Sequence, residues 1–107
     1  MSEPGGEPPS ANHPPDEAPI VRVLEICNKK GLHARASAKF VQTVEKFDAE
    51  VKVKRGNEVV GGTSIMGLMM LSAGPGATIT VEASGRDAAA VVDALAALVS
   101  GRFTEEE

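Results

Sequence analysis

The apolar residues of this chain recur with two different periods, and each period predicts one kind of element. Runs of β-branched residues and apolar–polar alternation are typical of strands, whereas apolar spacings of three or four residues are typical of helices. Strands are therefore expected at 20–26, 49–55, 58–60 and 78–82. Helices are expected at 33–47 and 65–71, and a last helix has Asp87 in its first turn, ends at Gly101 and carries the apolar stripe Val91, Val92, Leu95, Leu98 and Val99.

The order strand, helix, strand, strand, helix, strand, helix predicts an α+β fold. Gly56 and Asn57 stand between the second and third strands and form a two-residue hairpin signal. Because the strands are only half apolar, one face of their sheet should be covered by helices and the other should meet water. We expect a four-stranded antiparallel sheet with three helices on one face.

Residues 1–19 differ in composition from the rest of this 107-residue chain. They hold six of the seven prolines, four acidic residues and no lysine or arginine, which predicts a disordered leader followed by one domain at 20–107. The leader also accounts for the net charge of −4, because the other 88 residues carry 11 basic and 11 acidic side chains.

Composition excludes several classes of function. A neutral domain without Trp or Tyr argues against a nucleic-acid binder. Cys27 is the single cysteine, which excludes a disulfide framework and makes the reducing cytoplasm the default location. No apolar run is long enough to span a membrane. His13, Cys27 and His33 lack metal-ligand spacing, and neither a catalytic triad nor a nucleotide-binding loop stands out, so neither metal nor cofactor is expected.

The segment with most chemical content is Gly31-Leu32-His33-Ala34-Arg35-Ala36-Ser37-Ala38. Here a glycine loop leads into a helix that begins at a histidine. Backbone N–H groups at a helix start are unpaired and attract anions, so a phosphoryl group on the His33 ring would lie over them. Arg35 could add charge-assisted hydrogen bonds to that group. Lys29, Lys30 and Lys39 would suit an acidic partner if they share this surface.

From the residues alone, simpler interpretations remain open. His33 could be only a capping or surface residue. Ser64 follows Thr63 at the start of the second helix and could likewise only cap it. The apolar residues after Ser64, which include Met66 and Met69, could be ordinary core.

Two segments, taken together, favour a functional interpretation over these simpler ones. Gly31-Leu32-His33-Ala34-Arg35 and Ser64-Ile65-Met66-Gly67-Leu68-Met69 resemble the two signature segments of HPr, the histidine-containing phosphocarrier of the bacterial phosphotransferase system. The resemblance covers residues 20–103 and includes the order of strands and helices. It implies an HPr-like open-faced sandwich.

The resemblance also implies a function. His33 would accept a phosphoryl group from phospho-Enzyme I, charged by phosphoenolpyruvate, and pass it to an EIIA-type protein, with Arg35 attending the phosphoryl group. Ser64 matches the serine that an HPr kinase phosphorylates in many members. Partners would dock on Ile65, Met66, Leu68, Met69 and Lys39. The protein would be a monomeric phosphotransfer intermediate rather than an enzyme.

Some positions depart from the common pattern. Ala36 stands where many sugar-transport members have proline, and Thr63 stands where many members with the regulatory serine have lysine. The version with Ala36 resembles members in nitrogen-related or other regulatory phosphotransfer, so sugar uptake and regulation both remain open. Two further alternatives are a small regulatory or ligand-binding module of the same fold class and an effector that acts through phospho-Ser64.

Overall fold

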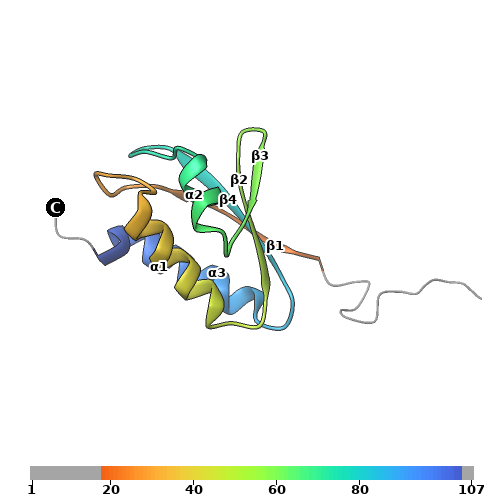
Figure 1. Cartoon of the computed structure of the whole chain (residues 1–107). Coiled ribbons are helices and arrows are strands. Elements are labelled where there is room, and N and C mark those ends of the chain that lie inside the picture. Colours follow the sequence, from red (N-terminus) through yellow and green to blue (C-terminus); the bar gives the residue numbers. More distant parts are fainter. Residues whose placement is uncertain (1–17, 105–107) are drawn as a thin grey trace, which may run out of the picture.

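The computed structural model describes residues 18–104. Its elements, in chain order, are β1 (Ile20–Glu25), α1 (Ala34–Glu45), β2 (Glu50–Arg55), β3 (Glu58–Gly61), α2 (Ile65–Met70), β4 (Thr78–Ser84), α3 (Ala88–Ser100) and a short 3-10 turn, η1 (Arg102–Thr104) (Figure 1). The four strands form one antiparallel sheet in the order β1-β4-β2-β3. The α+β fold with four antiparallel strands is therefore confirmed.

The core lies between one face of the sheet and the helices. Alternate residues of β2 and β4 point toward the helices and are buried, among them Val53 and Val81. Helix α1 contributes Phe40 and α3 contributes Val91 and Leu95, all fully buried. This alternation is the period-two pattern of a half-buried sheet, and it places all three helices on one side.

The other sheet face meets water, as the half-apolar strands predict. Val21 and Val23 of β1 and Val59 of β3 are more than half exposed on it. Lys54 and Glu82 form an ion pair at 2.7 Å between β2 and β4 on the same face. Because both side chains are still partly in contact with water, this pair contributes little stability.

Helix bounds differ slightly from the expected ones. Helix α1 begins at Ala34, one residue after His33, and ends at Glu45, so Phe47 packs against the core from beyond the helix. Asp87 is the N-cap residue of α3 rather than part of its first turn. Its carboxylate does not cap that helix; Oδ2 instead accepts a hydrogen bond from the Asp48 backbone N–H at 2.8 Å.

Periodicity did not predict the left-handed turn that follows α3. Arg102, Phe103 and Thr104 all have φ between 56° and 58°, and Phe103 is fully buried. The Lys39 ammonium of α1 donates to the Phe103 carbonyl at 2.6 Å and to Thr104 Oγ1 at 2.8 Å. These bonds stabilise the turn against α1.

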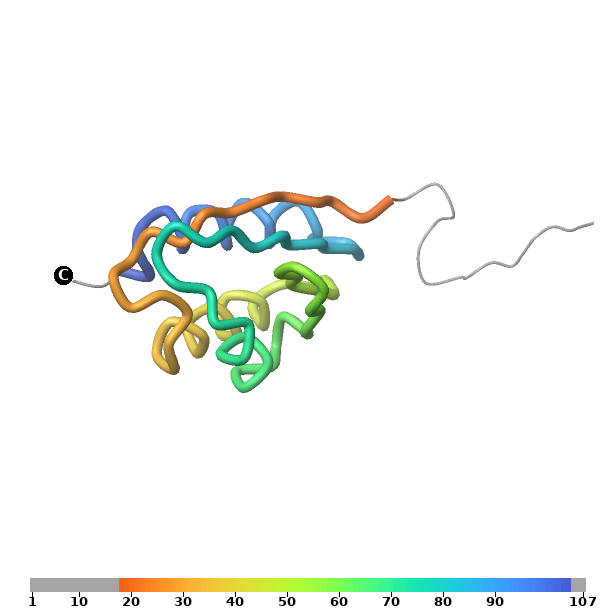
Figure 2. The backbone as a smooth tube through the Cα atoms, turned by 90° about the horizontal axis from the view of Figure 1, so that it is seen from above, coloured from red at the N-terminus to blue at the C-terminus, as the bar shows by residue number. Residues whose placement is uncertain are grey.

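Strand β1 spans the length of the sheet. Figure 2 shows that it starts at one end of the molecule and runs to the other, where the loop into α1 and the turn η1 both lie. The predicted leader at 1–19 falls almost wholly outside the described residues. Among residues 18–104, no helix is long and apolar enough to cross a bilayer.

Candidate functional site

His33 caps the N-terminus of α1. Its backbone is extended, with φ −77° and ψ −177°, and its Nδ1 accepts a hydrogen bond from the Arg35 backbone N–H at 3.2 Å. Its carbonyl accepts the first helical bond, from the Ser37 N–H at 2.8 Å. The ring is partly exposed. An acceptor nitrogen therefore faces the helix amides at a position that another molecule can reach.

The loop that precedes His33 is pinned against the segment after α2. Gly31 has φ +65°, and a Cβ at this position would lie 2.3 Å from the Ala73 carbonyl oxygen, so only glycine fits. The Leu32 N–H donates to that same oxygen at 3.0 Å. This close approach brings the His33 loop, residues 28–33, beside the end of α2.

Two polar side chains inside the protein also bind this loop. Asn28 and Ser37 are the buried polar residues of the described chain, and both have no exposed surface. Asn28 Nδ2 donates to the Gly31 carbonyl at 2.9 Å, and Ser37 Oγ donates to the Leu32 carbonyl at 3.3 Å. Neither residue stood out in the sequence, although asparagine commonly binds backbone groups a few residues away.

The expected basic residues divide into two groups. Lys29, Lys30 and Arg35 are exposed near the start of α1. Lys39 instead binds the C-terminal turn through its ammonium. Lys39 therefore joins α1 to the C-terminal turn by hydrogen bonds within the molecule, and the docking surface proposed below does not include it.

Ser64 caps α2 as His33 caps α1. Its Oγ accepts a hydrogen bond from the Gly67 N–H at 2.9 Å. A Cβ on Gly67 would lie 2.9 Å from Ser64 Oγ and 3.0 Å from Val60 Cβ, so glycine lets α2 pack closely on β3. Ser64 is exposed. Its hydroxyl thus combines a capping bond with access to solvent.

The apolar residues of α2 divide into core and surface. Leu68 is fully buried, so the expectation that it docks partners is wrong. Ile65 and Met69 are about 40% exposed, and Met66 is 70% exposed. Met70, which the sequence did not single out, is 68% exposed. We call Ile65, Met66, Met69 and Met70 the α2 surface.

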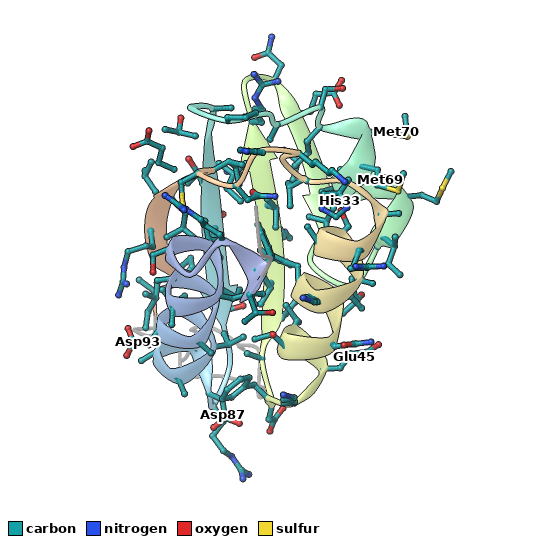
Figure 3. The ribbon with its side chains drawn as sticks, turned by 90° about the vertical axis from the view of Figure 1, so that its left-hand side faces the viewer. His33, Glu45, Met69, Met70, Asp87 and Asp93 are labelled. Carbon is teal, nitrogen blue, oxygen red and sulfur yellow. The ribbon has the colours of Figure 1, made fainter. Side chains whose placement is uncertain are left out.

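The α2 surface lies at the same end of the molecule as His33. Figure 3 shows Met69 and Met70 beside the end of α1 that His33 caps, and Asp87 at the opposite end. Helices α1 and α2 are also in contact. The structure thus brings together the residues of the two sequence segments that stand about 30 positions apart.

Comparison with known protein families identifies the family to which this chain belongs. The family described as "PTS HPr component phosphorylation site" matches residues 20–101. The chain belongs to the HPr family. HPr proteins are phosphocarriers of the phosphotransferase system, and membership of this family gives the chain the role of a phosphocarrier.

Curated relatives and solved structures agree with this assignment. The HPr of Cupriavidus necator is 51% identical over 88 residues, covering 82% of this chain and 99% of its own. The phosphocarrier NPr of Shewanella violacea is 45% identical over 86 residues, covering 80% and 94%. A crystal structure of HPr from Thermoanaerobacter tengcongensis has TM-score 0.78 and 40% identity, covering 82% of this chain and 99% of its own.

A further structure bears on assembly. A crystal structure of an HPr dimer from the same organism has TM-score 0.65 and 41% identity, covering 77% of this chain and 94% of its own. The expectation of a monomer therefore stays a prediction for this chain, which light scattering can test.

Proposed function

We propose that His33 carries the phosphoryl group and that Nδ1 is the nitrogen that accepts it. The observation that supports this is the hydrogen bond from the Arg35 N–H to Nδ1, because an acceptor nitrogen holds a lone pair. That lone pair points toward the helix start, where an added anion is favoured.

The family resemblance implies that Enzyme I carries its phosphoryl group on a histidine, so the transfer is a displacement between two ring nitrogens. The P–N bond of phospho-Enzyme I breaks and its electron pair returns to the donor ring, while the His33 Nδ1 lone pair forms the new P–N bond. Nδ1 then ceases to accept from the Arg35 N–H, which becomes available to a phosphoryl oxygen. The same exchange in the reverse direction delivers the group to an EIIA-type protein.

The helix end stabilises the phosphoryl group only weakly. A helix dipole contributes about 0.3–2 kcal/mol to an anion at its N-terminus. Arg35 is exposed beside that end and adds a charge that can move to the phosphoryl oxygens. A carrier must release as readily as it accepts, so modest stabilisation suits it.

Partners would bind across both helix ends. The α2 surface offers adaptable methionines next to the ring, and methionine suits surfaces that meet more than one partner. Lys29 and Lys30 are exposed in the His33 loop and would attract acidic partners. We expect these contacts to be small and partly polar, because small interfaces allow rapid exchange of partners.

Ser64 would be a regulatory phosphorylation site for an HPr kinase. It is exposed, and a phosphate at a helix N-terminus is tolerated by the helix. The same dianion would stand at the start of α2 and next to Met66, where it would repel acidic partners and disrupt apolar docking.

Labelling with phosphoenolpyruvate and Enzyme I tests the carrier proposal. The wild-type protein should take up an acid-labile, base-stable label, and His33→Ala should take up none. Unchanged labelling of His33→Ala would remove His33 from the mechanism. Failure of the wild-type protein to label would favour the alternative of a binding module without phosphotransfer.

A kinase assay tests the Ser64 proposal separately. HPr kinase with ATP should give an acid-stable phosphate on the wild-type protein and none on Ser64→Ala. Ser72 provides an internal control, since it is also exposed but follows α2 instead of capping it. An acid-stable phosphate that persists in Ser64→Ala would contradict the assignment.

A further inference from the structure

We propose that Asn28 is a positioning residue for phosphoryl transfer at His33. It acts through the Gly31 carbonyl, to which its side-chain amide donates a hydrogen bond. The inference rests on the proposed function of His33, and it adds a residue that none of the motifs contains.

The Gly31 carbonyl is shared by two donors. Asn28 Nδ2 donates to it at 2.9 Å, and the backbone N–H of His33 donates to it at the same distance of 2.9 Å. The orientation of this carbonyl therefore determines where the His33 N–H points. Asn28 fixes that orientation from a fully buried position, so the restraint does not depend on solvent.

The neighbouring peptide is restrained by other groups. The Leu32 N–H binds the Ala73 carbonyl, and the Leu32 carbonyl accepts from Ser37 Oγ. These bonds hold Leu32 but leave the Gly31 carbonyl to Asn28 and His33. Because Gly31 lacks a Cβ and has φ +65°, its own backbone resists rotation less than any other residue would. The orientation of the Gly31 peptide therefore depends more on a side-chain hydrogen bond than that of its neighbour does.

The position of His33 matters because transfer requires two ring nitrogens in line with the phosphorus. A displacement of about 1 Å in a reacting group can reduce a rate by roughly 100-fold. Loss of the Asn28 bond would broaden the orientations of the His33 backbone, and hence of its ring, without changing the surface that partners contact. The expected effect is on kcat and not on KM.

The test compares Asn28→Leu and Asn28→Ala with a matched control. Leucine has the shape of asparagine without its donor, and alanine also leaves space, so agreement between the two variants assigns the effect to the lost donor. Val91→Ala is the control, because Val91 is fully buried in α3 and lies outside the site. Three quantities are measured on each protein: the unfolding free energy, amide hydrogen exchange at His33, and kcat and KM for phosphoryl transfer from phospho-Enzyme I.

Both Asn28 variants should lower kcat on the order of tenfold at unchanged KM and accelerate exchange at the His33 amide. Val91→Ala, at an equal or larger loss of stability, should change neither quantity by more than twofold. Wild-type kcat and exchange in the Asn28 variants, or an equal fall in Val91→Ala, would overturn the inference. If the wild-type protein accepts no phosphoryl group, the proposed function fails, whereas unchanged His33 exchange would refute the positioning role itself.

Discussion

A side chain caps the N-terminus of both α1 and α2, but the surroundings of the two caps differ. His33 Nδ1 accepts from the second amide of α1, and Ser64 Oγ accepts from the third amide of α2. Around His33 the loop is held by bonds to Gly31 and Leu32 and by contact with Ala73. Around Ser64 the helix is only six residues long and its neighbours are exposed methionines.

This difference shows that capping alone does not decide function. Both side chains satisfy a backbone donor, which any short polar side chain could do. Imidazole adds a nitrogen that can form and release a P–N bond, and the pinned loop fixes where that nitrogen lies. The Ser64 hydroxyl would instead form a stable phosphate ester, and under the proposed regulation the added charge would alter docking on the α2 surface.

Replacing His33, the cap of α1, by serine, the residue type that caps α2, tests this comparison most strongly. His33→Ser should keep the helix capped, because serine is a preferred N-cap residue, and the unfolding free energy should change by less than about 1 kcal/mol. Phosphoryl acceptance should be abolished. Chemical denaturation and labelling with phosphoenolpyruvate and Enzyme I measure the two effects. Large destabilisation would show that imidazole has a structural role beyond capping.

Arg35→Gln should have the next largest effect. Glutamine keeps the backbone donor and much of the side-chain length but removes the charge. Hydrogen bonds to charged groups contribute about 1.5–3 kcal/mol, so transfer through His33 should slow roughly 10- to 100-fold. Quenched time courses of transfer from phospho-Enzyme I measure this, and the control is Arg22→Gln, because Arg22 lies on edge strand β1 and binds Asp93 of α3. An equal rate in both variants would show that Arg35 does not attend the phosphoryl group.

Met66→Lys should weaken docking on the α2 surface. Met66 is 70% exposed, and a charge at the centre of an apolar contact should raise KM roughly tenfold, with kcat at saturation unchanged. Val23→Lys is the matched control, because Val23 is 62% exposed on the open sheet face. Steady-state transfer measures both constants. A similar rise in KM for Val23→Lys would place the docking surface elsewhere or make the effect one of net charge.

Substitutions of Ser64 should give the smallest effect. Ser64→Ala removes the cap of α2 and should cost about 0.5–2 kcal/mol of stability, with no added charge. Ser64→Asp keeps a good cap and adds a negative charge, so it should be as stable as the wild type while KM rises a few-fold. Denaturation and transfer assays on the pair separate the two effects. A KM that rises only in Ser64→Ala would mean that the cap, not charge, controls docking.

Much of the fold was predictable because it depends on local periodicity. Alternation in β2 and β4 and the stripe of α3 gave the elements within a few residues, and the Gly56-Asn57 hairpin joins β2 to β3 as expected. His33 and Arg35 were predictable because they stand together in one segment at a helix start. The capping residues before Ile65 predicted the short helix α2, but they did not separate buried Leu68 from exposed Met70.

The remaining features depend on contacts between distant residues. The bond from Lys39 to Phe103 joins segments 64 positions apart, across a left-handed turn that no hydropathy pattern encodes. Asn28 and Ser37 act on backbone carbonyls, and their polar side chains gave no sign that they would be buried. Hydrogen bonds of this kind can be identified only once the three-dimensional path of the backbone is known.

The direction of β1 has a practical consequence for experiments on this protein. Strand β1 begins at one end of the molecule, and the loop that leads from it into α1 lies at the other (Figure 2). Six strand residues separate an attachment point at Ile20 from that loop by about 20 Å. A protein immobilised or fused through this end would therefore have the His33 loop at its opposite end, where the proposed phosphotransfer partners should still reach the ring.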